Sequence, residues 1–146
     1  MEEKLNDIEV RILGSLMEKE KTTPEYYPLT LNALTRACNQ KSNRNPVLSL
    51  DETTAVRALD GLTFDRNLVK RVRSDDTRVP KYRHDMKESL GLSDPEIAVT
   101  CILMLRGPQK QWVKSGAAQN AFMPSRVWLK LRLFWRHLRN GNRRLW

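Results

Sequence analysis

The sequence has few of the features that mark membrane proteins, secreted proteins or metalloproteins. It contains no run of about 18 apolar residues, so we expect no transmembrane helix and no membrane partner. Its charged start, residues 1–4, lacks the apolar segment of a signal peptide. The two cysteines, Cys38 and Cys101, do not have the spacing of metal ligands. We therefore expect reduced core thiols in a cytoplasmic protein that holds no metal or other cofactor.

Catalytic residues are equally scarce. The sequence has two histidines, His84 and His137, and neither belongs to a pattern typical of a nucleophile with its base. It has no glycine-rich phosphate-binding loop. We expect His84 to lie at the surface, after a predicted strand. The sequence therefore predicts a protein that is not an enzyme.

Acidic residues are missing from one end of the chain. Residues 109–146 contain nine Lys/Arg, no Asp or Glu, and all four tryptophans, whereas residues 1–108 contain 17 basic and 17 acidic residues. A strongly basic protein favours nucleic-acid or anionic-membrane partners. Here the formal net charge of +9 belongs wholly to the tail, so it does not indicate such a partner for the rest of the chain.

Local patterns in the first part of the chain predict three helices. Asn6 and Glu9 have the spacing of a capping box at the start of a helix. A second helix is expected from about Thr30, and a third from Asp51, which is a good N-cap. Asn67 is expected to end the third helix in a left-handed conformation. The expected apolar positions of these helices are Ile8, Ile12, Leu13, Leu16, Met17, Leu31, Leu34, Ala37, Cys38, Val56, Leu59 and Leu62.

A β-hairpin is expected after the third helix. Residues 68–73 alternate like a strand, a turn follows, and residues 79–83 return as the partner strand. Three helices followed by a hairpin is the order of a winged helix-turn-helix. We therefore predict an α+β fold, with one winged-helix domain over residues 1–86.

Several strings of residues are specific enough to suggest a family. They are residues 8–20, 22–24, 27–29, 31–44, 78–79 and 81–82. Through these strings the chain resembles, over residues 5–109, the YceH-like family of bacterial proteins. The resemblance implies two winged-helix domains in tandem, and it implies no particular activity.

The sequence predicts the start of a second domain but not the rest of it. Residues 92–97 repeat the pattern of residues 5–10, and the helix that follows to about Leu105 is apolar almost all round. We interpret residues 87–109 as a linker and the first helix of a truncated second winged-helix domain. Without the rest of that domain, helix 93–105 is expected to expose apolar surface and to promote self-association.

The tail, residues 110–146, shows none of the patterns expected of a second domain. Read in a shifted frame, the codons of residues 112–113 give glycine, those of 123–124 give alanine, and those of 134–135 give leucine. The shifted pattern resembles the second domain of the family. We therefore predict that the tail is translated out of frame and is not a native domain. The alternatives are a basic, tryptophan-bearing segment that binds single-stranded nucleic acid or an anionic membrane, or a tail without function.

The loop after the second predicted helix is the first candidate binding site. It contains Asn39, Gln40, Lys41, Ser42, Asn43 and Arg44. The two cations are suited to phosphate, and the amides to base edges or to the backbone of a partner. The alternative is that these side chains form an internal network that caps the helix ends.

The hairpin is the second candidate binding site. Its main basic residues are Arg71, Arg73, Arg78 and Lys81, with Lys70 and Arg83 beside them, and several of them are suited to phosphates or a minor groove. Asp75 and Asp76 at the tip oppose this interpretation, and charge on an edge strand also serves solubility. The third helix has a mixed-charge face, a poor match to a major groove. Its residues there are Asp51, Glu52, Thr53, Arg57, Asp60 and Arg66.

Two functions remain in competition after the sequence has been read. The first is a DNA-binding regulatory module that contacts double-stranded DNA with the hairpin and the loop. The second is an adaptor that binds another protein, which the zero net charge of residues 1–108 and the acidic third helix favour. Fold analogy favours DNA binding, although the same fold supports many functions.

Overall fold

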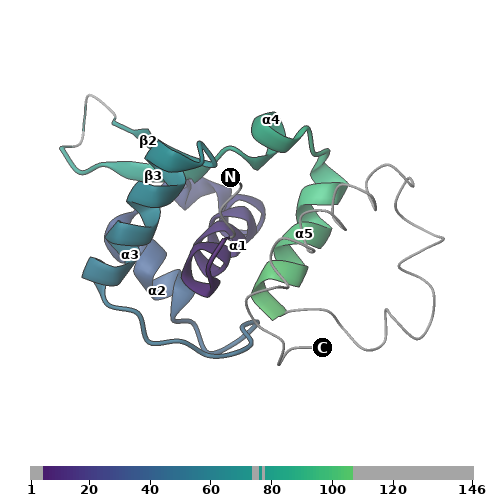
Figure 1. Ribbon diagram of the computed structural model, residues 1–146, viewed down its shortest axis with the longest axis horizontal. Coiled ribbons are helices and arrows are strands. Elements are labelled where there is room, and N and C mark those ends of the chain that lie inside the picture. Colours follow the sequence, from purple (N-terminus) through teal and green to yellow (C-terminus); the bar gives the residue numbers. More distant parts are fainter. Residues whose placement is uncertain (1–4, 74–75, 77, 107–146) are drawn as a thin grey trace.

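The described part of the chain forms an α+β fold in which a small antiparallel sheet lies at one side of a group of five α-helices (Figure 1). The computed structural model describes residues 5–73, 76 and 78–106. The regular elements are α1 (Asp7–Thr22), β1 (Leu29–Thr30), α2 (Leu31–Cys38), α3 (Glu52–Asp60), β2 (Val69–Val72), β3 (Lys81–His84), α4 (Met86–Leu90) and α5 (Asp94–Arg106). A 3-10 turn, Pro24–Tyr26, follows α1, and a π-helical turn, Gly61–Asp65, follows α3. In this part of the chain no helix is long and apolar enough to cross a membrane.

The helix starts that the sequence predicted are confirmed. The side chain of Asn6 accepts a hydrogen bond from the backbone N–H of Glu9 at 2.8 Å, and the Glu9 carboxylate accepts one from the backbone N–H of Asn6 at 3.2 Å. Thr30 caps α2 and Asp51 caps α3 in the same way, by accepting from the amide three residues later. Each cap satisfies an amide that has no partner within its helix. Asn67 has a φ of 55°, so the predicted left-handed stop is confirmed as well.

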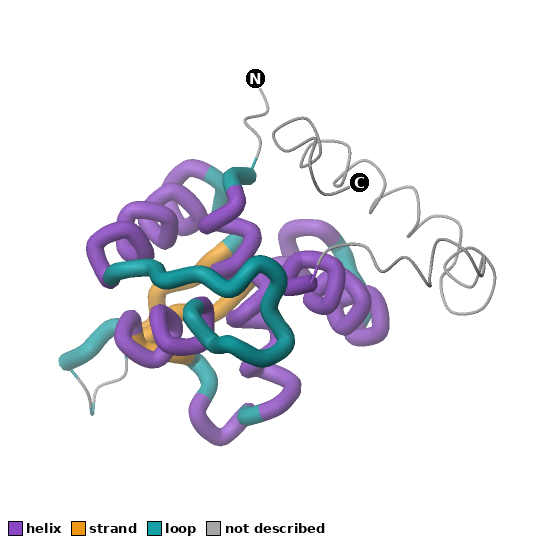
Figure 2. Tube along the Cα trace, turned by 90° about the horizontal axis from the view of Figure 1, so that it is seen from below, coloured by secondary structure: helices purple, strands orange, loops and turns teal. Residues whose placement is uncertain are grey.

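The sheet has the strand order β1-β3-β2 and is antiparallel throughout. The hairpin of β2 and β3 was predicted. The third strand, β1, was not, because two residues are too few to show an alternating pattern. Leu29 in β1 pairs with Tyr82 in β3. Figure 2 shows the strands as one short sheet beside the helices.

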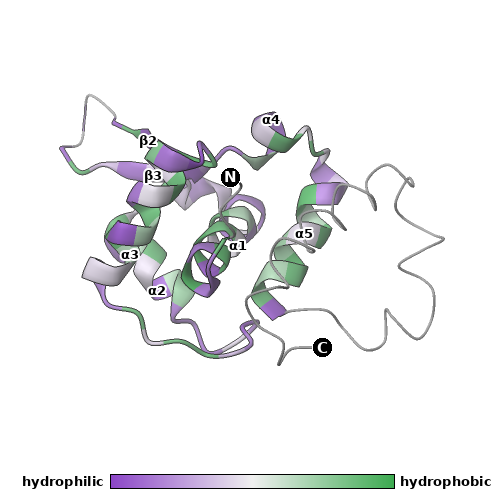
Figure 3. Ribbon diagram, in the orientation of Figure 1, coloured by the Kyte–Doolittle hydropathy of each residue, from purple (hydrophilic) through white to green (hydrophobic). Residues whose placement is uncertain are grey.

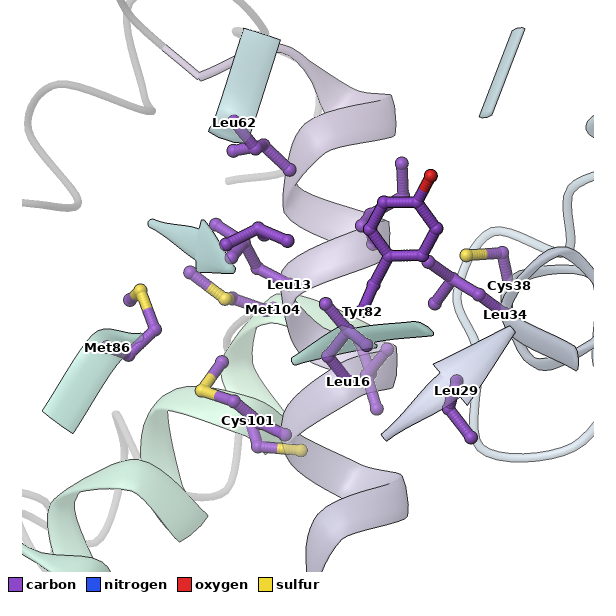
Figure 4. Packing of buried hydrophobic residues seen from close by; sticks show 14 of the residues in the cluster. Leu13, Leu16, Leu29, Leu34, Cys38, Leu62, Tyr82, Met86, Cys101 and Met104 are labelled. Carbon is purple, nitrogen blue, oxygen red and sulfur yellow. The ribbon is translucent and has the colours of Figure 1, made fainter. Parts of the chain in front are cut away.

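The hydrophobic core forms around α1 (Figure 4). Four α1 side chains at helical spacing are fully buried, namely those of Ile12, Leu13, Leu16 and Met17. They pack with Leu34 from α2, Leu59 and Leu62 from α3 and the turn after it, and Tyr82 from β3. The predicted core positions Ile8, Leu31 and Val56 are only half-buried, at the rim of the core.

The surface position predicted for His84 is wrong. The His84 side chain is 3% exposed, and its Nε2 atom lies 3.1 Å from Oε1 of Glu20. The Nδ1 atom accepts a hydrogen bond from the amide of Met86. The alternation of β3 places Tyr82 and His84 on the same inner face of the sheet, where both are buried. Residues 87–90, which were expected to be linker, belong to α4.

Helix α5 packs directly on α1. Leu105 and Met104 lie so close to Gly14 that a Cβ atom there would meet them at 2.9 and 3.1 Å. The Cys101 thiol donates to the Gly14 carbonyl at 3.3 Å. One side of α5 is therefore covered by α1, while Ile102 on the other side is 38% exposed. Figure 3 shows the apolar character of most of this helix.

No second domain is visible in residues 5–106. The tail on which the frameshift prediction falls lies outside the described residues, as does Asp75, which was predicted for the hairpin tip.

Candidate nucleic-acid interface

Arg44, a candidate of the loop, is buried inside the domain. Its Nη1 and Nη2 atoms donate to the Glu18 carboxylate at 2.9 and 2.8 Å, and its Nε atom donates to the Ala37 carbonyl at 3.0 Å. The Arg44 side chain has no exposed surface. The fork of the guanidinium matches the carboxylate, which makes this a strong, oriented ion pair. Arg44 therefore joins the loop to α1 and caps the end of α2.

Arg11 supports the same loop from the other side. Its Nη1 atom donates to the Cys38 carbonyl at 3.0 Å, and its Nη2 atom donates to the Pro46 carbonyl. Burial lowers the pKa of the Arg11 guanidinium, and the nearby charge of Arg44 lowers it further. Two buried arginines thus satisfy carbonyls at the end of α2, where a helix leaves acceptors without partners.

The amides of the loop also make internal contacts. The Asn39 side chain donates to the Leu50 carbonyl at 2.8 Å and accepts from the Leu50 amide at 2.7 Å. Gln40 accepts from Lys19 at 3.1 Å and donates to the Ser42 carbonyl at 2.9 Å. These contacts are those of the internal network that stood as the alternative to ligand binding.

The middle of the loop reaches the end of α5 (Figure 1). Asn43, with a φ of 57°, accepts from the Arg106 guanidinium through its side-chain oxygen. The amide of Asn45 donates to the Leu105 carbonyl at 2.9 Å. Lys41 and Ser42 are exposed. Of the two loop cations proposed for phosphate, Lys41 is the one that solvent reaches.

Pairing in the hairpin gathers three cations on one face. Lys70 lies opposite Arg83, and Val72 opposite Lys81. Residues that oppose each other in a ladder share a face of the sheet, so Lys70, Lys81 and Arg83 lie on the outer face. All three residues were predicted as binding candidates, but the strand register that places Lys70 opposite Arg83 was not predicted.

The other basic residues of the hairpin lie near its tip. Arg71, Arg73 and Arg78 are exposed, as expected. Arg71 is opposite Tyr82, on the inner side of the sheet, but it is exposed where the hairpin projects beyond the core. Val79 is also exposed, by 53%. The hairpin thus presents cations on its outer face and around its end.

Helix α3 presents the opposite charge. Glu52, Asp60 and Asp65 are exposed on α3 and its π-helical turn, together with Asp51 at the cap. Arg57 is exposed among them. Arg66 was predicted to be exposed but is only half-exposed, and its Nε atom pairs with the Glu9 carboxylate at 3.0 Å.

Comparison with known proteins identifies the family of this chain. The family described as "Protein of unknown function, DUF480" matches residues 5–114. The chain belongs to the DUF480 family. This confirms the resemblance to the YceH-like proteins, which the sequence placed at residues 5–109.

Curated relatives of this DUF480 chain are longer than the chain itself. UPF0502 proteins of Pelobacter propionicus and Geotalea daltonii are each 62% identical to it over 109 residues, which is 75% of this chain and 49% of the relative. A UPF0502 protein of Koribacter versatilis is 52% identical over 118 residues, 81% of this chain and 54% of the relative. The chain therefore spans about half the length of the curated relatives it matches.

Over residues 1–108 of the DUF480 chain, charge is balanced in number but separated in space. The two kinds of charge are equal over residues 1–108. In the folded domain the outer face of the hairpin is basic and exposed Asp76 accompanies the arginines near its tip, whereas α3 and its turn are mainly acidic. No group of His, Cys, Asp and Glu among the described residues could hold a metal ion.

Proposed function

We propose that the first domain, predicted over residues 1–86, is a winged helix that binds double-stranded DNA through its β-hairpin and catalyses no reaction. The order α1, β1, α2, α3, β2, β3 supports this fold, since α2 and α3 take the places of a helix-turn-helix and the hairpin follows as the wing. The fold alone is weak support for DNA binding. The charge of the hairpin carries the proposal.

The decisive observation is the cross-strand pair of Lys70 and Arg83. Like charges that oppose each other in a sheet destabilise it. Among the described residues a carboxylate stands near one of the two: Asp85 lies 3.7 Å from Lys70. With Lys81 on the same face and the arginines at the tip, the hairpin concentrates positive charge at a cost to its own stability. A polyanion removes that cost by supplying phosphates.

The test must separate the hairpin from the basic tail, which binds polyanions non-specifically because of its charge alone. Two variants of the full chain achieve this. The hairpin variant carries Lys70→Gln, Arg78→Gln and Arg83→Gln. The tail variant carries Arg136→Gln, Arg139→Gln and Arg143→Gln, so both lose the same charge. Binding to a labelled duplex is measured by fluorescence anisotropy from low to high salt.

We expect the hairpin variant to bind at least about tenfold more weakly than the tail variant at low salt. Each lost phosphate contact also lowers the slope of log K against log salt by about one, so the slope should fall by up to about three in the hairpin variant. Equal losses in the two variants would show that charge alone, and not the hairpin, holds the DNA.

A protein-binding adaptor is the second candidate function. Its support is the acidic surface of α3, together with Phe64, which is 69% exposed on the π-helical turn. Aromatic residues are enriched at the centres of protein interfaces. If the full chain binds no duplex at low salt, and Phe64→Ala abolishes the retention of a protein partner in a pull-down, the adaptor replaces the DNA-binding proposal.

A further inference from the structure

We infer that DNA lies against the hairpin and the outer face of the sheet, and that α3 stays out of the major groove. This inference rests on the proposed function and specifies how the duplex is held. In a helix-turn-helix protein the second helix of the motif enters the groove and its first residues contact base edges. Here the corresponding helix is α3.

The start of α3 is occupied by fixed carboxylates. The Asp51 side chain accepts from the Thr54 amide at 2.7 Å, so the positive end of the helix dipole is already neutralised. The Glu52 carboxylate accepts from the Asn32 side chain at 3.1 Å. These hydrogen bonds hold both carboxylates at the start of α3, the end that would face the bases. In a major groove the phosphates on either side would repel these carboxylates.

The rest of the exposed α3 surface is no better suited to a groove. Asp60 and Asp65 add two further carboxylates towards its end, against the single guanidinium of Arg57. Phe64 between them is largely exposed. A helix that enters the major groove ordinarily carries cations along the phosphates and polar groups over the bases.

The hairpin, in contrast to α3, presents positive charge that can contact phosphates. Lys81 and Arg83 are two positions apart on β3, about 6.6 Å along the strand, and Lys70 faces Arg83 from β2. Cross-strand neighbours are about 5 Å apart at Cβ. Three flexible cations on one small, regular surface can reach neighbouring phosphates together, and the arginines at the tip extend the contact.

Contact of this kind positions a protein on the backbone and carries little base information, because phosphates are the same at every base pair. The ligand class is therefore duplex DNA with little dependence on sequence. Such binding weakens steeply with salt.

The experiment compares three variants, all in the full chain that also carries the tail substitutions, so that differences arise in the domain. The first is Lys81→Gln with Arg83→Gln, on the outer face of the sheet. The second is Asp60→Asn with Asp65→Asn, and the third is Arg57→Gln, both on α3. Hydroxyl-radical cleavage reports contacts with the DNA backbone, and methylation of guanine N7 by dimethyl sulfate reports occupancy of the major groove.

We expect the sheet variant to bind at least about tenfold more weakly, the Arg57→Gln variant to bind within about twofold of its parent, and the Asp60→Asn/Asp65→Asn variant to bind as tightly or more tightly. The duplex should show backbone protection and unprotected guanine N7 atoms. Protection of N7 that Arg57→Gln removes would overturn the inference and leave DNA binding intact. Absence of binding by the parent chain at low salt would instead overturn the proposed function, and this inference with it.

Discussion

The guanidinium of Arg44 holds the carboxylate of Glu18 in a two-bonded ion pair inside the domain, with distances of 2.9 and 2.8 Å. The pair joins residues 26 positions apart in the sequence. It ties the loop after α2 to the central helix α1. Because Arg44 also donates to the Ala37 carbonyl, its loss would remove hydrogen-bond donors from two kinds of acceptor, a carboxylate and a backbone carbonyl.

We therefore predict that Arg44→Ala strongly destabilises the protein. Removing one partner of a buried ion pair costs about 3–5 kcal/mol, since the other charge stays buried. Arg44→Lys should recover only part of this loss, because an ammonium cannot donate two parallel bonds in the same fork. Urea denaturation measures the free energy of unfolding. The control is Lys41→Ala in the same loop, which should change the free energy of unfolding by less than about 0.5 kcal/mol because the Lys41 side chain is exposed. Equal effects of Arg44→Ala and Lys41→Ala would contradict the prediction.

The same pair predicts a loss of stability in acid. Burial acts to raise the pKa of Glu18, but the hydrogen bond and charge of Arg44, with those of Lys19, outweigh burial and hold the pKa below its ordinary value of 4.5. A carboxyl group with a lower pKa in the folded state stabilises the fold above its unfolded pKa, and this contribution disappears as the pH falls through the folded value.

We expect the free energy of unfolding to decrease as the pH falls below about 4.5, and to decrease less steeply in Glu18→Gln, which cannot lose a proton. Equilibrium unfolding in urea at a series of pH values makes the comparison. Glu25→Gln, at an exposed position, should keep the slope of the parent chain. A Glu18→Gln slope that matches the parent would show that this carboxylate does not contribute to the acid transition.

Two glycines in helical backbone predict opposite effects of the same substitution. A Cβ atom on Gly14 would lie 2.9 Å from Leu105 Cδ2 and 3.1 Å from Met104 Cβ, whereas on Gly61 its nearest neighbour would be 3.9 Å away. Gly61→Ala should stabilise the protein by about 0.5–1 kcal/mol through helix propensity. Gly14→Ala should destabilise it by about 1 kcal/mol or more, because overpacking between α1 and α5 exceeds that gain. Thermal unfolding of both variants gives the sign, and a similar gain in both would show that α5 adjusts freely.

Features that depend on a few neighbouring residues could be predicted from the sequence. The caps at Asn6 and Asp51, the helix start near Thr30 and the left-handed stop at Asn67 each depend on residues within about one helical turn, so local pattern is sufficient. The hairpin was found for the same reason. Its pairing register was not, because register depends on how both strands meet the core.

Features that depend on distant partners could not be predicted. Buried His84 finds its partner in Glu20, which lies 64 residues earlier, and buried Arg44 finds its partner in Glu18. A polar run such as Asn39–Arg44 has the composition of a binding loop whether its side chains face solvent or the interior. Its position in the fold distinguishes these possibilities, and composition does not.

Both cysteine thiols should be unreactive in the folded protein. Burial, with a smaller effect of the Glu18 charge, raises the pKa of Cys101 to about 12, and burial also raises the pKa of Cys38. Because the thiolate is the reactive form, we expect modification by a disulfide reagent at pH 8 to be on the order of 100-fold slower than in urea. Ser42→Cys places a thiol on the exposed loop and should react at an ordinary rate. If Cys101 reacted as fast as this thiol, α5 would not be held against α1.

The break in composition after residue 108 predicts a shifted reading frame, and sequencing of the coding DNA tests it directly. The acidic residues stop while every tryptophan follows. The family match ends at residue 114, within the first residues of the tail. We expect a missing or extra base in the codons of residues 107–112, and a corrected translation that encodes glycine where Trp112 and Val113 now meet. The corrected sequence should then align with the Pelobacter propionicus relative well beyond the present 109 residues.

An intact frame would overturn the prediction and make the basic tail a genuine part of this protein. The nine cations of the tail must then be included in any account of DNA binding.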